Sequence, residues 1–289
     1  MSVDARVDYL LHLADNALIL GQSNAEWCGH GPILEEDIAM ANIGLDHIGQ
    51  ARLLYQHVAA KLAPTLATSC AALPPEGANF SRGGPSKNWP QPITEDKLAY
   101  FRNAEEFRNY VLLELPHNTA FAPSAAVERD YAVTVARNFL YASLMLIVWD
   151  GLQASTDSQL AAIAAKSLKE VRYHLRHATD WMLRLGDGTP GSRARLQAAV
   201  DHLMPYTQEF WTASAMHSDA IKAGVAIDMQ PLQERWQASV DAVLTEATLE
   251  APSAVGHITR GKEGVHSEHL SYLLAEMQSL ARAHPQAVW

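Results

Sequence analysis

The chain has 289 residues, of which 48% are apolar and 19% charged, and its 32 acidic and 22 basic residues give a net charge of −10. This composition is typical of a globular protein with a large core and excludes an intrinsically disordered chain. Lysine and arginine are scattered singly, so we expect neither a nucleic-acid partner nor a membrane surface.

Helical periodicity begins near the N-terminus, and strand signals are almost absent from the chain. Apolar residues from Val7 to Leu18 recur on one face and predict a first amphipathic helix. A second helix is expected from about 33 to 62, because Pro32 and three acids suit a helix N-terminus. Residues 63–93 contain six prolines and three glycines. They predict a long loop, either a tolerated surface insertion or a lid that contacts a partner.

The middle of the chain predicts a central helix. Before it, Thr94 is a good N-cap for a third helix, which is expected to end at Pro116. The fourth helix, about 125–156, is apolar nearly all round between Phe139 and Trp149, so other helices must surround it. That run of 11 residues is too short to span a membrane, which takes about 20 residues.

The remaining sequence continues the helical pattern. Helices are expected over residues 157–185, 192–223, 231–247 and 265–283. The first of these has a clean apolar stripe and stops at a turn rich in glycine, residues 186–190. The sequence therefore predicts an all-α helical bundle with additional C-terminal helices, in one domain of residues 1–289.

The cysteines and the N-terminus indicate the compartment. Cys28 and Cys70 are the only cysteines, and they form no metal-type pair, which favours a reducing environment without disulfides. Asp4, Asp8 and Asp15 interrupt the first apolar stretch, so we expect no signal peptide. A cytoplasmic protein is expected.

Acids and histidines inside the predicted bundle raise the question of a metal centre. Carboxylate-bridged di-iron bundles take their ligands as Glu, Glu-x-x-His, Glu and Glu-x-x-His from successive core helices. In the helix at 157–185, Glu170 is followed three residues later by Tyr173 and not by histidine, although His174 and His177 are near. This helix is a near match to the pattern.

The other core helices match less well. Asp46 is followed three residues later by Gly49, and His47 lies about 100° round the helix from Asp46. The central helix has no acid between Asp130 and Asp150, and Arg137 would oppose bound cations. The first helix offers only the shorter Asp15.

We therefore predict no catalytic residue and no metal ligand in this chain. The polar residues are expected to form one buried network, the remnant of a metal site: Asp15, Asp46, Gln50, Arg137, Glu170, His174 and His177. The alternative is an autonomous di-iron oxidase with the atypical ligands Asp15, Asp46, Glu170 and His174. Two further Glu-x-x-His strings, Glu114 to His117 and Glu263 to His266, lie at helix edges and are interpreted as chance matches.

Long specific strings resemble a known family. They span residues 27–39, 45–54, 106–109, 164–181, 184–189 and 264–289. They are similar to the structural subunit, designated C, of the bacterial phenylacetyl-CoA epoxidases, which are ring 1,2-phenylacetyl-CoA monooxygenases.

The resemblance implies a ferritin-like subunit of a multicomponent monooxygenase that degrades phenylacetate in the cytoplasm. A catalytic sister subunit would hold the di-iron centre and bind phenylacetyl-CoA. A further small subunit and a reductase component, which delivers electrons from NADPH, would complete the complex that inserts oxygen as an epoxide. This chain would be the structural partner and would carry no cofactor itself.

Overall fold

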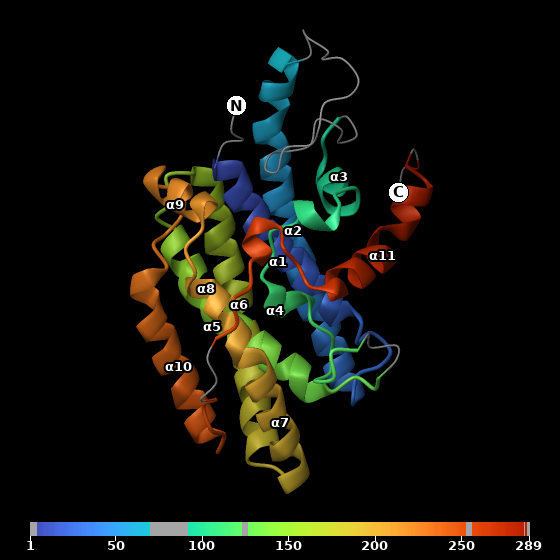
Figure 1. Ribbon diagram of the computed structural model, residues 1–289, viewed down its shortest axis with the longest axis vertical. Coiled ribbons are helices and arrows are strands. Elements are labelled where there is room, and N and C mark those ends of the chain that lie inside the picture. The colour runs from blue at the N-terminus through green and yellow to red at the C-terminus, as the bar shows by residue number, and fades with distance from the viewer. Residues whose placement is uncertain (1–4, 70–91, 123–126, 253–255, 286, 288–289) are drawn as a thin grey trace.

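The computed structural model describes residues 5–69, 92–122, 127–252, 256–285 and 287 (Figure 1). These residues form helices, with no strand among them beyond an isolated bridge between Arg260 and Val265. The longer helices are α1 (Ala5–Ala25), α2 (Leu34–Ser69), α5 (Tyr131–Leu152), α6 (Ser158–Gly186), α7 (Pro190–Leu203), α10 (Gln233–Glu246) and α11 (Glu268–Ala283). The shorter ones are α3 (Glu95–Tyr100), α4 (Val111–Glu114), α8 (Gln208–Trp211) and α9 (Ala215–Lys222), with 3₁₀ turns at Ala104–Glu106, Met204–Thr207, Gln230–Leu232 and Gly261–Glu263.

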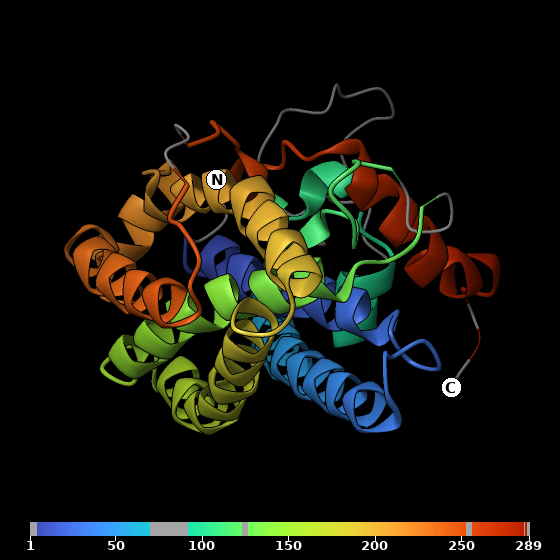
Figure 2. The same ribbon diagram turned by 90° about the horizontal axis from the view of Figure 1, so that it is seen from below.

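Two helical hairpins form the centre of the fold. The α1–α2 hairpin packs against the α5–α6 hairpin, and Figure 2 shows the two side by side. Helices α1 and α2 approach closely at two glycines, since a Cβ added to Gly44 would lie only 3.3 Å from the carbonyl oxygen of Gly21. The C-terminal helices α7 to α11 cover the outside. The predicted fold class, an all-α ferritin-like bundle with additional C-terminal helices, is confirmed.

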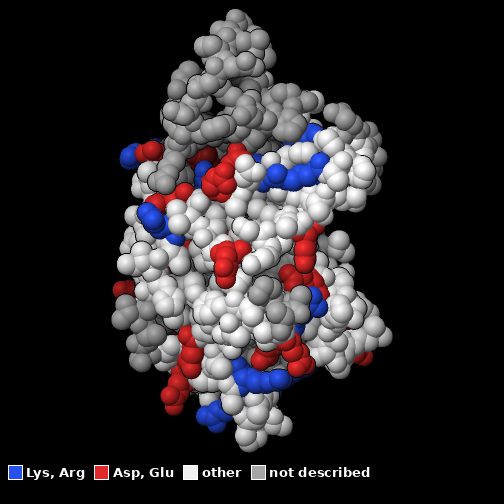
Figure 3. Space-filling model, turned by 45° about the vertical axis from the view of Figure 1, so that its right-hand side comes forward, with Lys and Arg blue, Asp and Glu red and all other residues white. Residues whose placement is uncertain are grey.

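Helix α5 is the central helix, as the sequence predicts. Among the described residues it is the one helix long and apolar enough to cross a membrane, and 94% of its apolar window is buried within the protein. Helix α10 helps to cover it, because Trp236 packs there and donates from Nε1 to the carbonyl of Leu140 at 3.3 Å. The face drawn in Figure 3 carries acidic and basic residues interspersed among uncharged ones.

The third predicted helix, from Thr94 to Pro116, is wrong. Thr94 does cap a helix, accepting from the amide of Lys97 at 3.3 Å, but α3 ends at Tyr100 and only the short α4 follows. The reason is that backbone amides between them bond to side chains of other elements. The amide of Arg108 donates to Asp15 and that of Tyr110 donates to Asn16, each at 2.8 Å, so these amides cannot continue a helical ladder.

Other predicted boundaries also need correction. Helix α2 continues to Ser69, past the expected loop start at 63, because one proline removes a single helical hydrogen bond without always ending the helix. Helix α5 begins at Tyr131, where Asp130 caps it, and not at 125. The expected helix 192–223 divides into α7, α8 and α9, with Pro205 in the 3₁₀ turn after α7. Most of the predicted 63–93 loop, residues 70–91, lies outside the described residues.

The glycine contact between α1 and α2 can be tested with a matched pair of substitutions. A Cβ at Gly21 would lie 3.1 Å from the Cβ of His47, so Gly21→Leu should force the helices apart and lower the free energy of unfolding by about 1–3 kcal/mol. A Cβ at Gly49 meets nothing within 4 Å, so Gly49→Ala should raise it by up to about 1 kcal/mol. Urea unfolding followed by circular dichroism measures both. Equal midpoints for the two variants would contradict this packing.

Candidate functional site

The polar residues predicted to form one network lie in three separate clusters, so that prediction is wrong in its extent. Five of them lie between α2 and α6: Asp46, Gln50, Glu170, His174 and His177. Asp15 belongs to a second cluster and Arg137 to a third. His47 of α2 packs against Gly21 of α1. Asp15 lies six residues before Gly21, so it is about 9 Å away from that contact along the axis of α1.

The first cluster, which we call the α2–α6 seam, consists of cross-links between two antiparallel helices. Gln50 Nε2 donates to Glu170 at 2.9 Å, and His174 Nε2 lies 2.9 Å from Asp46 Oδ2. Further along, His177 Nε2 lies 2.8 Å from Glu36 Oε2. Asp46 is partly open to solvent, with 39% of its side chain exposed, so the seam reaches the surface.

Sequence reasoning missed several members of the seam. Glu36 also accepts from the Tyr131 hydroxyl at 2.7 Å. At the other end, Asp157 lies 2.9 Å from both His57 and Lys61. Burial raises the pKa of Asp157, but these two neighbours outweigh that effect and lower it to about 2. Both acids lie at helix N-termini, where a carboxylate is expected for capping alone, so their sequence positions gave no sign of the cross-links.

On the buried side of the seam, two histidines face each other. The ring centroids of His47 and His174 are 4.8 Å apart, and the Nδ1 atom of each has no hydrogen-bond partner among the described residues. Burial holds the pKa of His47 well below its usual value, so this imidazole is neutral. On α5, the residue beside His47 is Tyr141, whose ring lies 6.2 Å from the imidazole, whereas a di-iron bundle needs a carboxylate from each core helix.

The donor set of the seam does not fit two iron ions. Of its carboxylates, Asp46 and Glu170 are already engaged by His174 and Gln50, and α5 contributes none. Within the part of the chain that the structure describes, no three His, Cys, Asp or Glu side chains are placed to hold a metal. Asp15, which the alternative prediction requires as a ligand, belongs to another cluster.

The second cluster is a buried ion pair between Asp15 and Arg102, both 0% exposed. Arg102 Nη1 donates to Asp15 Oδ2 at 3.1 Å, and Nη2 makes a second, shorter contact to Oδ1. The Tyr55 hydroxyl also donates to Oδ1, at 2.5 Å. Burial alone would lower the pKa of Arg102, but Asp15 and Tyr55 outweigh it and the pKa lies above its usual value. The cluster joins α1, α2 and the segment after α3.

The third cluster surrounds Arg137 on α5. Its Nη1 donates to the carbonyl of Leu115, and its Nη2 lies 2.7 Å from His117 Nδ1. Since His117 Nδ1 accepts, its Nε2 carries the proton and donates to the carbonyl of Ser23 at 2.9 Å. Burial lowers the pKa of Arg137 to about 10, an effect that Glu26 opposes. The guanidinium therefore fastens the loop after α4 to α5, and His117 fastens the same loop to α1.

The two Glu-x-x-His strings interpreted as chance matches meet in the fold. Glu114 of the first string lies 2.8 Å from Nδ1 of His266 in the second, and it accepts from the amide of Ser267 at 2.6 Å. This fourth polar contact joins α4 to the start of α11.

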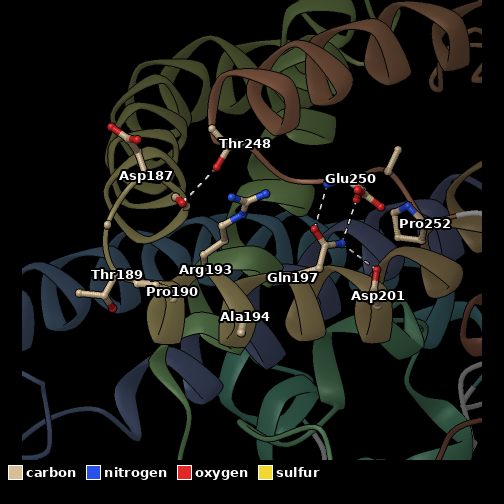
Figure 4. A pocket seen from close by; sticks show the side chains of 13 residues that line it. Asp187, Thr189, Pro190, Arg193, Ala194, Gln197, Asp201, Thr248, Glu250 and Pro252 are labelled. Carbon is tan, nitrogen blue, oxygen red and sulfur yellow. Dashed lines mark hydrogen bonds between the residues drawn. The ribbon is translucent and has the colours of Figure 1, made fainter.

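A separate cleft of about 930 Å³ opens at the turn between α6 and α7 (Figure 4). Gln197 of α7 joins the two sides of the cleft: its side-chain amide donates to the carbonyl of Glu250 and accepts from the Glu250 amide, each at 2.9 Å. The Arg193 side chain points from α7 into the cleft, which Asp187 and Glu250 also line. Its lining includes no histidine or cysteine and shares no residue with the seam, so we assign it no chemistry.

Paired helical hairpins with acids and histidines turned inward define this protein as a ferritin-like bundle. The chain belongs to the phenylacetic acid catabolic protein family, whose sequence profile matches residues 1–289. It is 38% identical over 281 residues to the subunit designated C of 1,2-phenylacetyl-CoA epoxidase from Escherichia coli (strain K12), a match that covers 97% of this chain and 98% of that protein. The family resemblance of the sequence is confirmed.

The buried ion pair generates a stability test. Asp15→Ala leaves the Arg102 charge unpaired in the core, so the free energy of unfolding should fall by about 3–5 kcal/mol. Asp46→Ala, at the partly exposed end of the seam, should cost about 1 kcal/mol or less. Urea unfolding of both variants measures the difference. A double variant, Asp15→Leu with Arg102→Met, should recover part of the loss because no charge is then buried alone, although the Arg108 amide and the Tyr55 hydroxyl still lose their acceptor.

The contact between His266 and Glu114 should depend on pH. Burial lowers the pKa of His266, but Glu114 outweighs it, so the pKa in the folded state lies above 6.5. A raised histidine pKa contributes stability that is fully present below about 6.5 and is lost as the pH rises through the folded-state value. The cost of His266→Gln should therefore be larger at pH 6 than at pH 9. The exposed His30→Gln serves as the control, and equal costs for His266→Gln at the two pH values would contradict the contact.

Proposed function

We propose that this chain is the non-catalytic structural subunit of a multicomponent 1,2-phenylacetyl-CoA epoxidase that acts in aerobic phenylacetate degradation. Its relative in E. coli is named as one of the subunits of that enzyme, and the similarity covers nearly the full length of both chains. The family match over residues 1–289 supports the same pathway.

The observation that carries the non-catalytic role is the composition of the bundle interior. A di-iron centre needs a carboxylate from each core helix, and α5 supplies Arg137, Asn138 and Tyr141 at the corresponding depth. The acids of the seam are bound by histidine and amide groups of this same chain. Iron chemistry therefore belongs to another subunit, and this chain carries no cofactor.

The partners follow from that division of roles. A catalytic subunit holds the di-iron centre and the phenylacetyl-CoA, a reductase supplies electrons from NADPH, and a further small subunit is the remaining component. This chain supports the catalytic subunit through its surface, and its interior ion pairs keep that surface rigid. We place the complex in the cytoplasm and assign the chain no nucleic-acid or membrane partner.

Co-expression with the catalytic subunit tests the proposal. We expect the chain purified alone to contain no stoichiometric iron, and the complex to contain iron in proportion to its catalytic subunit. The double variant Gln50→Leu with Glu170→Leu removes a seam cross-link and leaves no buried charge unpaired, since Lys166, which also contacts Glu170, is 61% exposed. Iron content and product formation by the complex should therefore be unchanged. About two iron ions per chain in the isolated protein, lost in this variant, would instead identify an autonomous di-iron oxidase.

A further inference from the structure

A small cavity lies between the C-terminal end of α1, the loop that follows α4 and helix α11. It has a volume of about 110 Å³, several times the space that one water molecule needs. Leu115, Pro116 and Leu273 form an apolar part of its wall, and it reaches the surface at the exposed Tyr272 and Glu276. Its charged and titratable lining residues are Glu26, Glu114, Arg129, His269 and Glu276. It shares no residue with the α2–α6 seam or with the cleft at the α6–α7 turn.

One wall of the cavity is a histidine that the fold buries without a hydrogen-bond partner. His269, in the first turn of α11, is 7% exposed, and its imidazole makes no hydrogen bond or ion pair with another described residue. Glu114 is not available to it, because that carboxylate already bonds to His266 and to the amide of Ser267. Buried polar groups are normally hydrogen-bonded, since burial takes away their bonds to water. The position of His269 therefore favours a partner inside the cavity.

The charged groups around His269 also lack close partners. Nε of Arg129 is buried without a hydrogen-bond partner among the described residues, and it lies 3.7 Å from Glu26 Oε2, which is too far for a hydrogen bond. The exposed carboxylate of Glu276 makes no hydrogen bond or ion pair with a described residue. Burial raises the pKa of Glu26, an effect that Arg137 and Arg129 oppose and that Glu276 reinforces. Two carboxylates and one guanidinium at this cavity therefore have bonding capacity to spare.

These groups together exclude a ligand of a single charge. A simple cation between Glu26 and Glu276 would lie beside the positive charge of Arg129 and leave it without an acceptor. A simple anion at Arg129 would face both carboxylates. Within the part of the chain that the structure describes, no three His, Cys, Asp or Glu side chains are placed to hold a metal ion, so one ion cannot use His269 and both glutamates. The lining fits a ligand that carries a positive and a negative group on separate atoms.

We infer that this cavity binds a small zwitterion, of the size of a short α-amino acid. The ammonium group of the ligand donates hydrogen bonds to Glu26 and Glu276. Its carboxylate accepts from the guanidinium of Arg129 and from the imidazole of His269, and its short side chain contacts the apolar wall. The inference does not rest on the proposed function, because residues of this chain alone build the cavity.

Binding of L-alanine to the full chain tests the inference. Isothermal titration calorimetry should give a dissociation constant of about 1 mM, a reasonable value for a ligand of about six non-hydrogen atoms. Methylammonium and acetate each carry one of the two charged groups, so each should bind about tenfold more weakly or less tightly still. The imidazole resonances of His269 in the NMR spectrum should shift when alanine is added, and their loss in His269→Gln identifies them.

Two charge-removing variants show whether the alanine lies in this cavity. Glu276→Gln and Arg129→Gln each remove one charge from a side chain that solvent reaches, so the fold should be kept, which circular dichroism checks. Each should weaken alanine binding by about tenfold, since each removes a hydrogen bond between charged groups. The matched control is Glu268→Gln, an exposed glutamate of the same helix that does not line the cavity, and it should bind alanine as the unaltered chain does.

Each outcome decides for or against the zwitterion site. Alanine binding that both cavity variants weaken and the control keeps, and that exceeds the binding of methylammonium and of acetate, supports the inference. If alanine does not bind, or if Glu276→Gln and Arg129→Gln bind it as tightly as the control, the inference is overturned. Methylammonium that binds as tightly as alanine would identify a cation site, and acetate that does so an anion site. Either of these results also overturns the inference, while the proposed function stands.

Discussion

A charge placed in a helical core must find its partner there, and the pair of Asp15 and Arg102 shows how much of this fold depends on that constraint. One carboxylate accepts from the guanidinium, from Tyr55 on α2 and from the amide of Arg108. It thereby joins the first hairpin to the segment between α3 and α4. Because the amide of Arg108 bonds to Asp15, that segment leaves the helical path and covers the bundle as an extended strip.

The same constraint explains the interior between the hairpins. In the α2–α6 seam each acid is matched with a histidine, an amide or a hydroxyl, and Arg137 is matched with a carbonyl and a neutral histidine. Three buried nitrogens of these clusters have no partner among the described residues: Nδ1 of His47, Nδ1 of His174 and Nε of Arg137. The acids, by contrast, are bonded to groups of this chain, so they help to specify one packing arrangement and are not open to a metal. A bundle whose polar interior is used for its own packing fits the structural role that we propose for this chain.

Local signals predicted some elements closely and others not at all. Helix α6 was predicted within one residue at each end, because Asp157 caps it, a clean apolar stripe runs through it and a glycine turn ends it. The helix expected between Thr94 and Pro116 was wrong because Asp15 and Asn16, distant in sequence, take its backbone amides. For the candidate site, the residue types were identified, whereas Arg102, Glu36 and Asp157 were missed as partners.

The sequence by itself determined the helical class, the central position of α5, the absence of an acid between Asp130 and Asp150, and the family. Each of these depends on periodicity, composition or a string of residues, which are properties of neighbours along the chain. Only the tertiary structure decided which acid meets which cation. Asp15 and Arg102 are 87 residues apart, and Glu114 and His266 are 152 apart. Such pairs depend on how helices are rotated and stacked across the core, and the helical repeat of one segment carries no information about the rotation of another.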